Sequence, residues 1–543
     1  MLKWIKNKYK QQIESMPSHD KSKTDPRLER QIAKSLFVNQ KRLEHILGDS
    51  DDIIYRNLTI NIDQPIAAML IYIRGLIKKD TINENILKPL MYEYTQSTDD
   101  KLSNSNEESI FEFLQNNMLT VGCLTPVTTY QDILSSIFSG NTVLIINGEH
   151  EAISMYSKGW DKRGVTEPQN DISIRGSHEG FTESIRTNTA MIRRRIKNHN
   201  LRFESFTLGR YSKTKVCLAY IKGIANEEII NEARKRINKI DIDGILESGY
   251  IEQYINDSSF SIFPTLGHTE KPDIVSSKLL EGRIAIVTDS TPTVLTAPFL
   301  FAEVFQSPGD YYSNFIVSSV FRIIRWITYF LAVALPGFYV AAQAFHYEMI
   351  PTKLMFTIAA AQEGVPFSGV IEILLMSTFF VILREAGIRM PRSIGTATSI
   401  VGALVLGDAA ITAGLVGAPA VMVTAVSGLS TFVVPILAGP ITILRVFFIL
   451  LGGCAGIYGI SLGLIFLLAH MSALTSFGIP YMAPIAPFNL KDQRDELLKA
   501  PIWADLERPN EFAENNIVKQ NPKSALKPLS DGEFIIENED DKS

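Results

Sequence analysis

The sequence predicts an α+β protein with a membrane α-helical part. It consists of two related cytoplasmic α/β subdomains and then a multi-pass helical membrane domain with one partial or re-entrant segment. Three observations support this class. Charged residues are dense in residues 1–310 and few in 326–470, the charged half contains an internal repeat, and the apolar half contains several long runs. The union of a soluble and an apolar half also explains a mean hydropathy of only +0.08.

The chain has 543 residues, too many for one compact core. Its net charge of −5 and lack of a basic face give no indication of nucleic-acid binding. The basic N-terminus lacks an apolar core, so it is not a cleavable secretory signal, and the soluble half is expected in the cytoplasm. The expected regions are a basic disordered tail (1–27), subdomain 1 (28–150), a connector with an Arg-rich helix (151–199), subdomain 2 (200–310), a transmembrane helical domain (315–475) and a cytoplasmic polar tail (476–543).

The soluble half contains the same pattern twice. Residues 68–90 resemble residues 216–237: each has an apolar run with β-branched residues, a glycine, and a polar stretch with helical spacing. This order predicts a strand, a turn and a helix. Residues 137–148 likewise resemble residues 279–290 and predict a helix end, a glycine and a buried strand. Internal similarity of this kind indicates two related subdomains.

No pattern in the soluble half indicates catalysis or a cofactor. The motifs of dinucleotide-binding proteins, phosphate-binding loops, zinc proteases and serine hydrolases are absent. The three cysteines are scattered and are expected to be free thiols in a reducing compartment. Asp241 and Asp243 lack further oxygen ligands at calcium-loop spacing, which favours a turn and helix cap. We therefore expect that the protein is not an enzyme and that it binds neither a metal ion nor a cofactor.

The connector carries the most charged helix. Apolar residues mark one face of residues 185–196. Beside or opposite this face lie Arg186, Arg193, Arg194 and Arg195. One interpretation is a solvated helix face. The other is a contact between subunits, in which these arginines bind carboxylates of a neighbouring copy through paired hydrogen bonds.

A membrane-spanning helix needs about 20 apolar residues. The candidates are 326–345, 367–383, a small-residue stretch near 394–416, 418–438 and 441–471. Basic residues precede the first stretch and follow the second and the last, so both chain ends are expected in the cytoplasm. That arrangement requires an even number of crossings. One of the five candidates is therefore expected to cross incompletely, unless the count itself is wrong.

The stretch GDAAITAGLVGAP, residues 407–419, is the best candidate for the partial segment. Gly407 and Gly414 belong to rows of small residues, which let helix backbones approach closely in lipid. Asp408 would cost about 2.5–3.5 kcal/mol at a lipid-facing helix centre. We expect protein or water, rather than lipid, to surround this segment.

Two further charged residues, Glu372 and Arg445, lie within apolar runs. A pair between Arg445 and an acid is one possibility, and a position near the membrane surface is another. The candidate pore or gating residues are therefore Asp408, Glu372, Gly407, Gly414 and Arg445.

Several long strings in the chain resemble the A subunit of spore germination receptors, the GerA family. They include EGFTESIRTNTAMIRRRIK, EGRIAIVTDSTPTVLTAPFLFAEVFQSPGDYY, ILREAGIRMPRSIGTA and GDAAITAGLVGAP, within about residues 130–505. Two places depart from the family pattern. Ser177 and His178 stand where the family usually has proline and a basic residue, and Gly417 stands where it commonly has the serine of GLVSP.

The resemblance implies a nonenzymatic subunit in the inner membrane of bacterial endospores. It implies partnership with a transporter-like B subunit, which is expected to bind the nutrient, and with a lipoprotein C subunit. It also implies a homo-oligomer, expected to be a pentamer, that opens as a nutrient-gated cation channel and triggers germination.

Two other functions stay open at this point. A solute transporter or exporter subunit would also suit broken helices and buried acids, although residues 326–470 contain no internal repeat. A membrane scaffold that clusters receptor partners would need no ion path.

Overall fold

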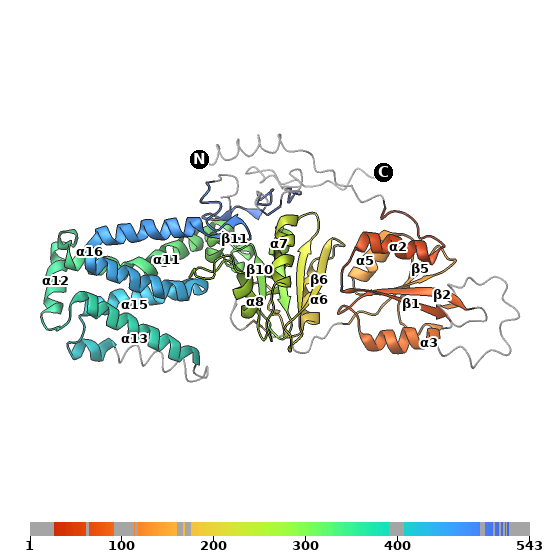
Figure 1. The fold of residues 1–543 in the computed structure, drawn as a ribbon, viewed down its shortest axis with the longest axis horizontal. Coiled ribbons are helices and arrows are strands. Elements are labelled where there is room, and N and C mark those ends of the chain that lie inside the picture. Colours follow the sequence, from red (N-terminus) through yellow and green to blue (C-terminus); the bar gives the residue numbers. More distant parts are fainter. Residues whose placement is uncertain are drawn as a thin grey trace, which may run out of the picture.

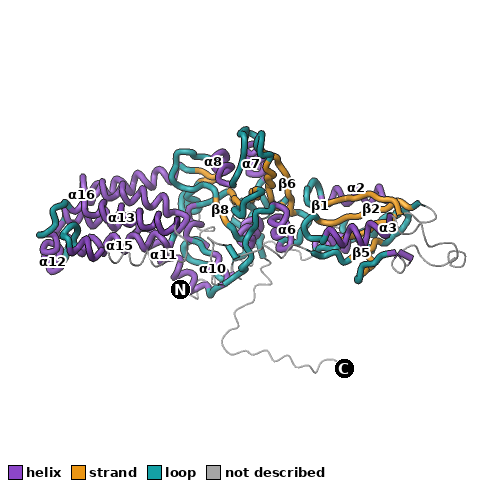
Figure 2. Tube along the Cα trace, turned by 90° about the horizontal axis from the view of Figure 1, so that it is seen from below, coloured by secondary structure: helices purple, strands orange, loops and turns teal. Residues whose placement is uncertain are grey.

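The structure, a computed structural model, describes residues 27–60, 65–91, 113–114, 118–159, 167–168, 175–389, 407–488, 495–502, 505–509, 512–513, 516 and 518–520. The predicted tail before residue 27 and the small-residue stretch before residue 407 lie outside these ranges. Two α/β subdomains and a helical bundle follow one another along the long axis of the molecule (Figure 1). Figure 2 shows from a second side that the strands belong to the subdomains and the long helices to the bundle.

Subdomain 1 is a five-stranded antiparallel sheet with the order β1-β2-β4-β5-β3. Helices α2 and α5 pack on one face, and η1 with α3 packs on the other. Its elements are α2 (Leu36–Leu47), β1 (Ile53–Ile60), β2 (Ile66–Ile73), the π-helix η1 (Thr81–Leu87), α3 (Lys88–Met91), β3 (Leu124–Val127), α5 (Tyr130–Phe138), β4 (Thr142–Ile146) and β5 (Ala152–Met155).

Subdomain 2 repeats this arrangement with the strand order β6-β7-β9-β10-β8, again antiparallel. Helices α6 and α9 pack on one face, and α7 and α8 pack on the other. Its elements are α6 (Ile185–Arg195), β6 (Leu201–Leu208), β7 (Thr214–Ile221), α7 (Glu227–Asn238), α8 (Ser248–Ile255), β8 (Gly267–Thr269), α9 (Pro272–Leu280), β9 (Ile284–Thr288) and β10 (Val294–Ala297).

The predicted strand, turn and helix appear in both subdomains. β2 and β7 each end at a glycine with positive φ, Gly75 at +96° and Gly223 at +83°, before the next helix begins. In the second repeated pattern, Gly140 at +89° and Gly282 at +100° join a helix to a fully buried strand. Glycine is favoured at these turns because other residues are strained at positive φ.

The repeat extends further than the sequence prediction. A buried asparagine occupies the same place in α2 and α6, and its amide group bonds both backbone groups of the residue six positions earlier. Asn39 contacts Ala33 at 2.9 and 2.6 Å, and Asn188 contacts Thr182 at 2.8 and 2.5 Å. The connector helix α6 is therefore the first helix of the second repeat, and it packs on the second sheet.

The bundle follows subdomain 2. It begins with η4 (Phe301–Phe305) and α10 (Pro308–Tyr312) and continues with α11 (Phe315–Ala344), η5 (Tyr347–Met349), α12 (Thr352–Gln362), α13 (Gly369–Arg389), a short helical segment at 407–412, α15 (Ala418–Val433), η6 (Pro435–Leu437) and α16 (Ala438–Ala473). A small hairpin, β11 (Thr475–Ser476) and β12 (Ile479–Pro480), comes next. In the described part of the chain, Phe315–Ala344 and Pro435–Ala473 are long and apolar enough to cross a membrane.

Helix α16 reverses direction at Gly456, which has a non-helical backbone with φ +61° and ψ −145°. A Cβ atom on Gly459 would lie 2.4 Å from the Leu451 carbonyl oxygen, and one on Gly463 would lie 3.1 Å from the Phe448 ring. Residues so far apart along one straight helix cannot touch, because each residue adds 1.5 Å of rise. The single span predicted over 441–471 is therefore two antiparallel helical halves, 438–455 and 457–473.

A buried ion pair joins subdomain 1 to α6. Arg193 is fully buried, and its guanidinium group donates to both carboxylate oxygens of Asp52 at 2.8 and 2.9 Å. The Ser50 hydroxyl also contacts both partners. Because Asp52 lies at the start of β1 and Arg193 lies near the end of α6, this pair fixes one repeat against the other.

We predict that Arg193→Met lowers the free energy of unfolding by about 3–5 kcal/mol, because Asp52 is then left buried without its cation. The double variant Asp52→Leu, Arg193→Met should recover much of this loss, since it removes both charges. Thermal unfolding of the full chain in detergent micelles provides the measurement. Arg210→Met, which removes an exposed pair with Asp241, is the control and should unfold at the original temperature.

Candidate functional site

A proline in α11 creates a free backbone acceptor inside the bundle. Pro336 has no N–H group, so the carbonyl of Ala332, four residues earlier, loses its usual helical donor. Two side chains of other helices donate to this oxygen: Arg445 Nε of α16 at 3.0 Å and the Ser427 hydroxyl of α15 at 2.8 Å. The proline therefore defines the point where three helices meet.

Arg445 is 2% exposed and is held by neutral groups. Besides the Ala332 carbonyl, its Nη2 donates to the Ser427 carbonyl at 3.0 Å and to the Thr431 hydroxyl at 2.6 Å. Among the described residues it forms no ion pair, so the possible pairing with an acid is not seen there. The guanidinium group thus joins α16, which carries it, to α11 and α15 by donating to oxygens of those two helices.

Glycines allow α11 and α16 to touch backbone to backbone beside this point. A Cβ on Gly452 would lie 2.5 Å from the Gly337 carbonyl oxygen, and a Cβ on Gly337 would lie 2.6 Å from the Phe448 carbonyl oxygen. Any larger residue at either position would push the helices apart. Close approach through small residues is typical of helix pairs that pack in lipid.

Glu372 is fully buried near the start of α13 and contacts the start of α15. One carboxylate oxygen accepts a hydrogen bond from the backbone N–H of Gly417, the N-cap residue of α15, and the other accepts from Gln362 Nε2 at 3.5 Å. A negative charge is favourable at a helix N-terminus. A Cβ on Gly417 would lie 3.2 Å from this carboxylate, so glycine allows the close contact.

The rest of residues 407–419 folds as a short helix followed by a tight turn. Gly414 has φ +65°, and a Cβ there would lie 3.2 Å from the Gly364 carbonyl oxygen. Gly407 is buried beside Val421, whereas Asp408, on the same short helix, is exposed. The structure therefore brings Glu372 and Gly417 together but leaves Asp408 exposed.

The connector arginines have separate surroundings. Arg193 pairs with Asp52, while Arg194 and Arg195 both pair with Glu179. Arg186 is exposed and lines a cleft of about 1180 Å³ between α6 and the β2–η1 region. Arg186 is thus the arginine of this set that is best placed to contact another molecule.

The remaining polar candidates carry no metal chemistry in the described residues. Asp241 forms a two-point contact with Arg210 at 2.8 and 2.6 Å. In the described ranges, no three His, Cys, Asp or Glu side chains gather as metal ligands. The cysteines are free, and burial raises the pKa of the Cys217 thiol well above its ordinary value.

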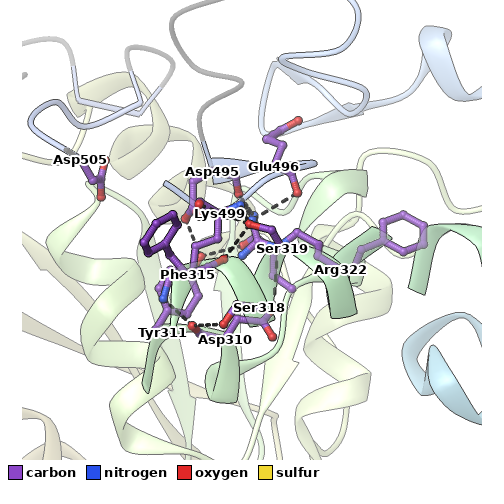
Figure 3. Close-up of polar contacts among 12 residues, drawn as sticks. Asp310, Tyr311, Phe315, Ser318, Ser319, Arg322, Asp495, Glu496, Lys499 and Asp505 are labelled. Carbon is purple, nitrogen blue, oxygen red and sulfur yellow. Dashed lines mark hydrogen bonds and ion pairs between the residues drawn. The ribbon is translucent and has the colours of Figure 1, made fainter. Parts of the chain in front are cut away.

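A group of buried and partly buried polar side chains lies where the chain enters the bundle (Figure 3). We call it the junction cluster; it consists of Asp310, Tyr311, Arg322, Arg325, Asp495 and Lys499. Asp310 is 4% exposed, and its carboxylate accepts from Arg325 at 2.7 and 2.9 Å. Arg322 Nε lies 3.7 Å from the same carboxylate, and Lys499 donates to the Asp310 carbonyl.

The junction cluster ties the C-terminal tail to the base of α11. Arg322 Nη1 donates to the Asp495 carboxylate at 3.1 Å, and the Tyr311 hydroxyl donates to it at 2.7 Å. The backbone N–H of Lys499 donates to Ser319 at 3.0 Å. Burial raises the pKa of Asp495, although the charge of Arg322 acts against this, and burial lowers the pKa of Lys499.

The tail then reaches subdomain 2. Arg508 Nε donates to the Leu280 carbonyl at 2.8 Å, and the Arg283 guanidinium lies 4.2 Å from the centre of the Phe512 ring. Arg283 also pairs with Glu303. Burial raises the pKa of the Glu303 carboxyl, but the charges of Arg283 and Lys278 outweigh this effect and hold the pKa below its ordinary value. The tail therefore bridges the bundle and subdomain 2.

Sequence reasoning missed the junction cluster. It treated Arg322, Arg325 and Lys499 only as positive charges that orient membrane helices. One local signal was present: Ser307 and Asp310 form a capping box at the start of α10, a pattern visible in SPGD. The partners from the tail lie more than a hundred residues away along the chain, and no local pattern predicts them.

We predict that Arg445→Met lowers the free energy of unfolding by about 1–3 kcal/mol, because buried oxygens lose their donor. In a Pro336→Ala background the loss should be smaller, since the restored helical N–H serves the Ala332 carbonyl. The expected coupling is about 0.5–3 kcal/mol, measured by unfolding of the full chain in detergent micelles. Arg384→Met is the matched control and should be additive with Pro336→Ala. Additive losses for Arg445→Met would contradict the assignment.

We predict that Asp310→Ala lowers the free energy of unfolding by about 3–5 kcal/mol, because Arg325 loses its carboxylate and stays partly buried. Hydrogen exchange should also quicken in residues 495–502, which the cluster holds. Glu385→Ala, which removes an exposed pair with Arg389, is the control and should change neither quantity. Unchanged exchange in 495–502 would show that the tail is held by other contacts.

Comparison with known proteins places these features in a family. The family model described as Bacillus/Clostridium GerA spore germination protein matches residues 41–511. Spore germination protein KA of Bacillus subtilis (strain 168) is 41% identical over 501 residues, which cover 92% of this chain and 90% of that protein. Spore germination protein GerLA of Bacillus cereus is 36% identical over 481 residues, covering 88% of this chain and 96% of that protein.

A solved structure is also similar. The crystal structure of the N-terminal domain of the A subunit of the Bacillus megaterium spore germinant receptor GerK3 is 38% identical, with a TM-score of 0.40. The match covers 50% of this chain and 98% of that chain. On the extent of the family match and the identity to its members, this chain belongs to the GerA family of spore germination proteins.

Proposed function

We propose that this chain is the A subunit of a nutrient germinant receptor in the inner membrane of the bacterial spore. In this proposal, copies of the chain surround a nutrient-gated cation path whose opening triggers germination. The observation that carries the proposal is the position of Asp408. It is exposed, on a short helix that packs against α13 and α15.

An exposed carboxylate is costly on this part of the molecule unless water or another copy covers it. Its neighbours Ile411 and Leu415 are 39% and 40% exposed, and Met422 is 70% exposed, as expected for a surface that faces lipid or another copy. A charge facing lipid at such a place costs about 2.5–3.5 kcal/mol. Facing a hydrated path, the same carboxylate attracts cations.

The reversal at Gly456 supports cytoplasmic positions for both chain ends. Six crossings, an even number, result when 441–471 is counted as two and 394–416 is proposed as a complete crossing in place of the partial one expected from the sequence. Arg322, Arg325 and Arg384 then lie at the cytoplasmic ends of their helices, as the distribution of positive charge favours.

The junction cluster and the tail are the proposed route from the cytoplasmic subdomains to the path. They join α11, which carries the Pro336–Arg445 contact, to subdomain 2. The nutrient binds the B subunit in this proposal, and the lipoprotein C subunit completes the receptor. Arg186 is the proposed contact between copies. Opening requires that the nutrient-bound B subunit interact differently with the open and the closed state of this chain.

We predict that Asp408→Lys abolishes nutrient-triggered cation flux and that Asp408→Asn lowers the preference for cations over anions. The reason is that the first change reverses the charge facing the path and the second removes it. The measurement is conductance in planar bilayers of the full chain, purified with its B and C partners, with and without nutrient.

Glu385→Gln is the matched control, because Glu385 is an exposed acid paired with Arg389 on α13. It should conduct like the unchanged protein. Flux that saturates and exchanges solute would identify a carrier instead. Normal flux and germination in Asp408→Lys would reject the role of this carboxylate and favour a scaffold.

A further inference from the structure

Subdomain 2 carries large apolar side chains on and next to α8 that are exposed in the described part of the structure. Tyr250 and Tyr254 lie one turn apart on α8 and are 45% and 55% exposed. Leu246, just before α8, is 69% exposed, and Phe260, in the loop after it, is fully exposed. We call these four residues the aromatic face. Two views place α8 at the end of subdomain 2 next to the bundle (Figures 1 and 2).

The loop that carries Phe260 is fixed to the end of α16. The Ser261 hydroxyl lies 3.2 Å from His470 Nε2, and the Phe263 ring lies 6.1 Å from the His470 ring. On the other side of Phe260, the Asp257 carboxylate accepts from the Thr475 hydroxyl at 3.2 Å. Phe260 is thus held between contacts to residues 470 and 475, where the second half of α16 ends at Ala473.

Two acids near the aromatic face have partners within the protein. Asp257 pairs with Arg236. Glu247 accepts from the backbone N–H of Gly249 and from the hydroxyls of Ser248 and Thr291, and so caps α8. Glu252 of α8 is partly exposed and Gln253 is exposed, so the surface around the four residues also carries polar side chains. Its large exposed side chains are two tyrosines, a leucine and a phenylalanine. Such amphipathic rings are favoured at the boundary between headgroups and acyl chains.

We infer that the aromatic face is a membrane anchor, which seats α8 and Phe260 in the headgroup layer of the bilayer that the bundle crosses. The inference rests on the membrane position of α16 proposed above. The anchor fixes subdomain 2 against the membrane surface, so that the base of α11 and the junction cluster keep a constant depth. We assign a lipid surface as the partner because the aromatic face lies beside the end of the apolar helix α16.

The test uses the full chain in vesicles of phosphatidylcholine and phosphatidylglycerol. Cys123→Ser and Cys454→Ser remove the exposed thiols, and the buried Cys217 stays. Phe260→Cys is labelled with an environment-sensitive fluorophore, and quenching is measured with headgroup-nitroxide lipid, with acyl-chain-nitroxide lipid and with aqueous iodide. Phe37→Cys, 64% exposed on α2 in subdomain 1, is the matched aqueous control. Leu468→Cys, 55% exposed on α16, is the membrane control.

We expect headgroup nitroxide to quench the label at 260 strongly, whereas the label at 37 loses fluorescence only to iodide. Quenching at 468 by acyl-chain nitroxide with none at 260 by headgroup nitroxide overturns the anchor alone. Protection of 260 from both quenchers, with chemical cross-linking between two copies at 260, assigns the face to a second copy and also overturns it. No quenching at 468 overturns the membrane position and the anchor together. Absent cation flux in vesicles with a quenched 260 rejects only the channel.

Discussion

A proline leaves the carbonyl of Ala332 without its helical donor inside α11, and an arginine from α16 and a serine from α15 take that donor's place. Backbone polar groups at membrane depth must be satisfied within the protein, because acyl chains offer no partners. The pairing of α11 with α16 therefore depends on the break that Pro336 makes in α11. α16 has to bring Arg445 to Ala332, and Gly337 and Gly452 then allow the two backbones to touch.

Two sets of charged contacts link the parts of the molecule in series. Asp52 and Arg193 hold the first repeat against the second, and the junction cluster holds the C-terminal tail against the base of α11. The tail in turn contacts subdomain 2 through Arg508 and Phe512. A buried charge whose partner is removed destabilises a protein strongly, so such pairs tend to move together or to separate completely. A shift of α11 is therefore expected to move the tail and, through it, subdomain 2.

Much of the soluble fold could be predicted from the sequence. The strands, turns and helices of the repeat follow from apolar runs and glycines, and both sheets have the expected elements. The spacing of Ser35 and Asn39 is the same as that of Ser184 and Asn188 and is present in the sequence. These are isolated polar matches between otherwise different helices, so they do not by themselves predict the shared bond. Family membership was predicted from long strings around these elements and is confirmed by the match over residues 41–511.

The bundle and its base were harder to predict, for physical reasons. Gly456 reverses the chain inside an apolar run that contains other glycines and no Asn, Asp or Pro that would mark the turn. The partners of Arg445 are mainly backbone oxygens, which every residue carries, so composition cannot identify them. Arg322 and Asp495 are 173 residues apart, and only the complete fold brings them together.

The distance along the chain between Arg322 and Asp495 also constrains biosynthesis. Domains form from the N-terminal end while the ribosome is still adding residues. The entire bundle must therefore be made before Asp495 and Lys499 exist to close the base of α11. Until that moment, Asp310 is the acid near Arg322 in the part of the chain that the structure describes. The helices of the bundle thus gain these contacts at the base of α11 only after translation has passed the last of them.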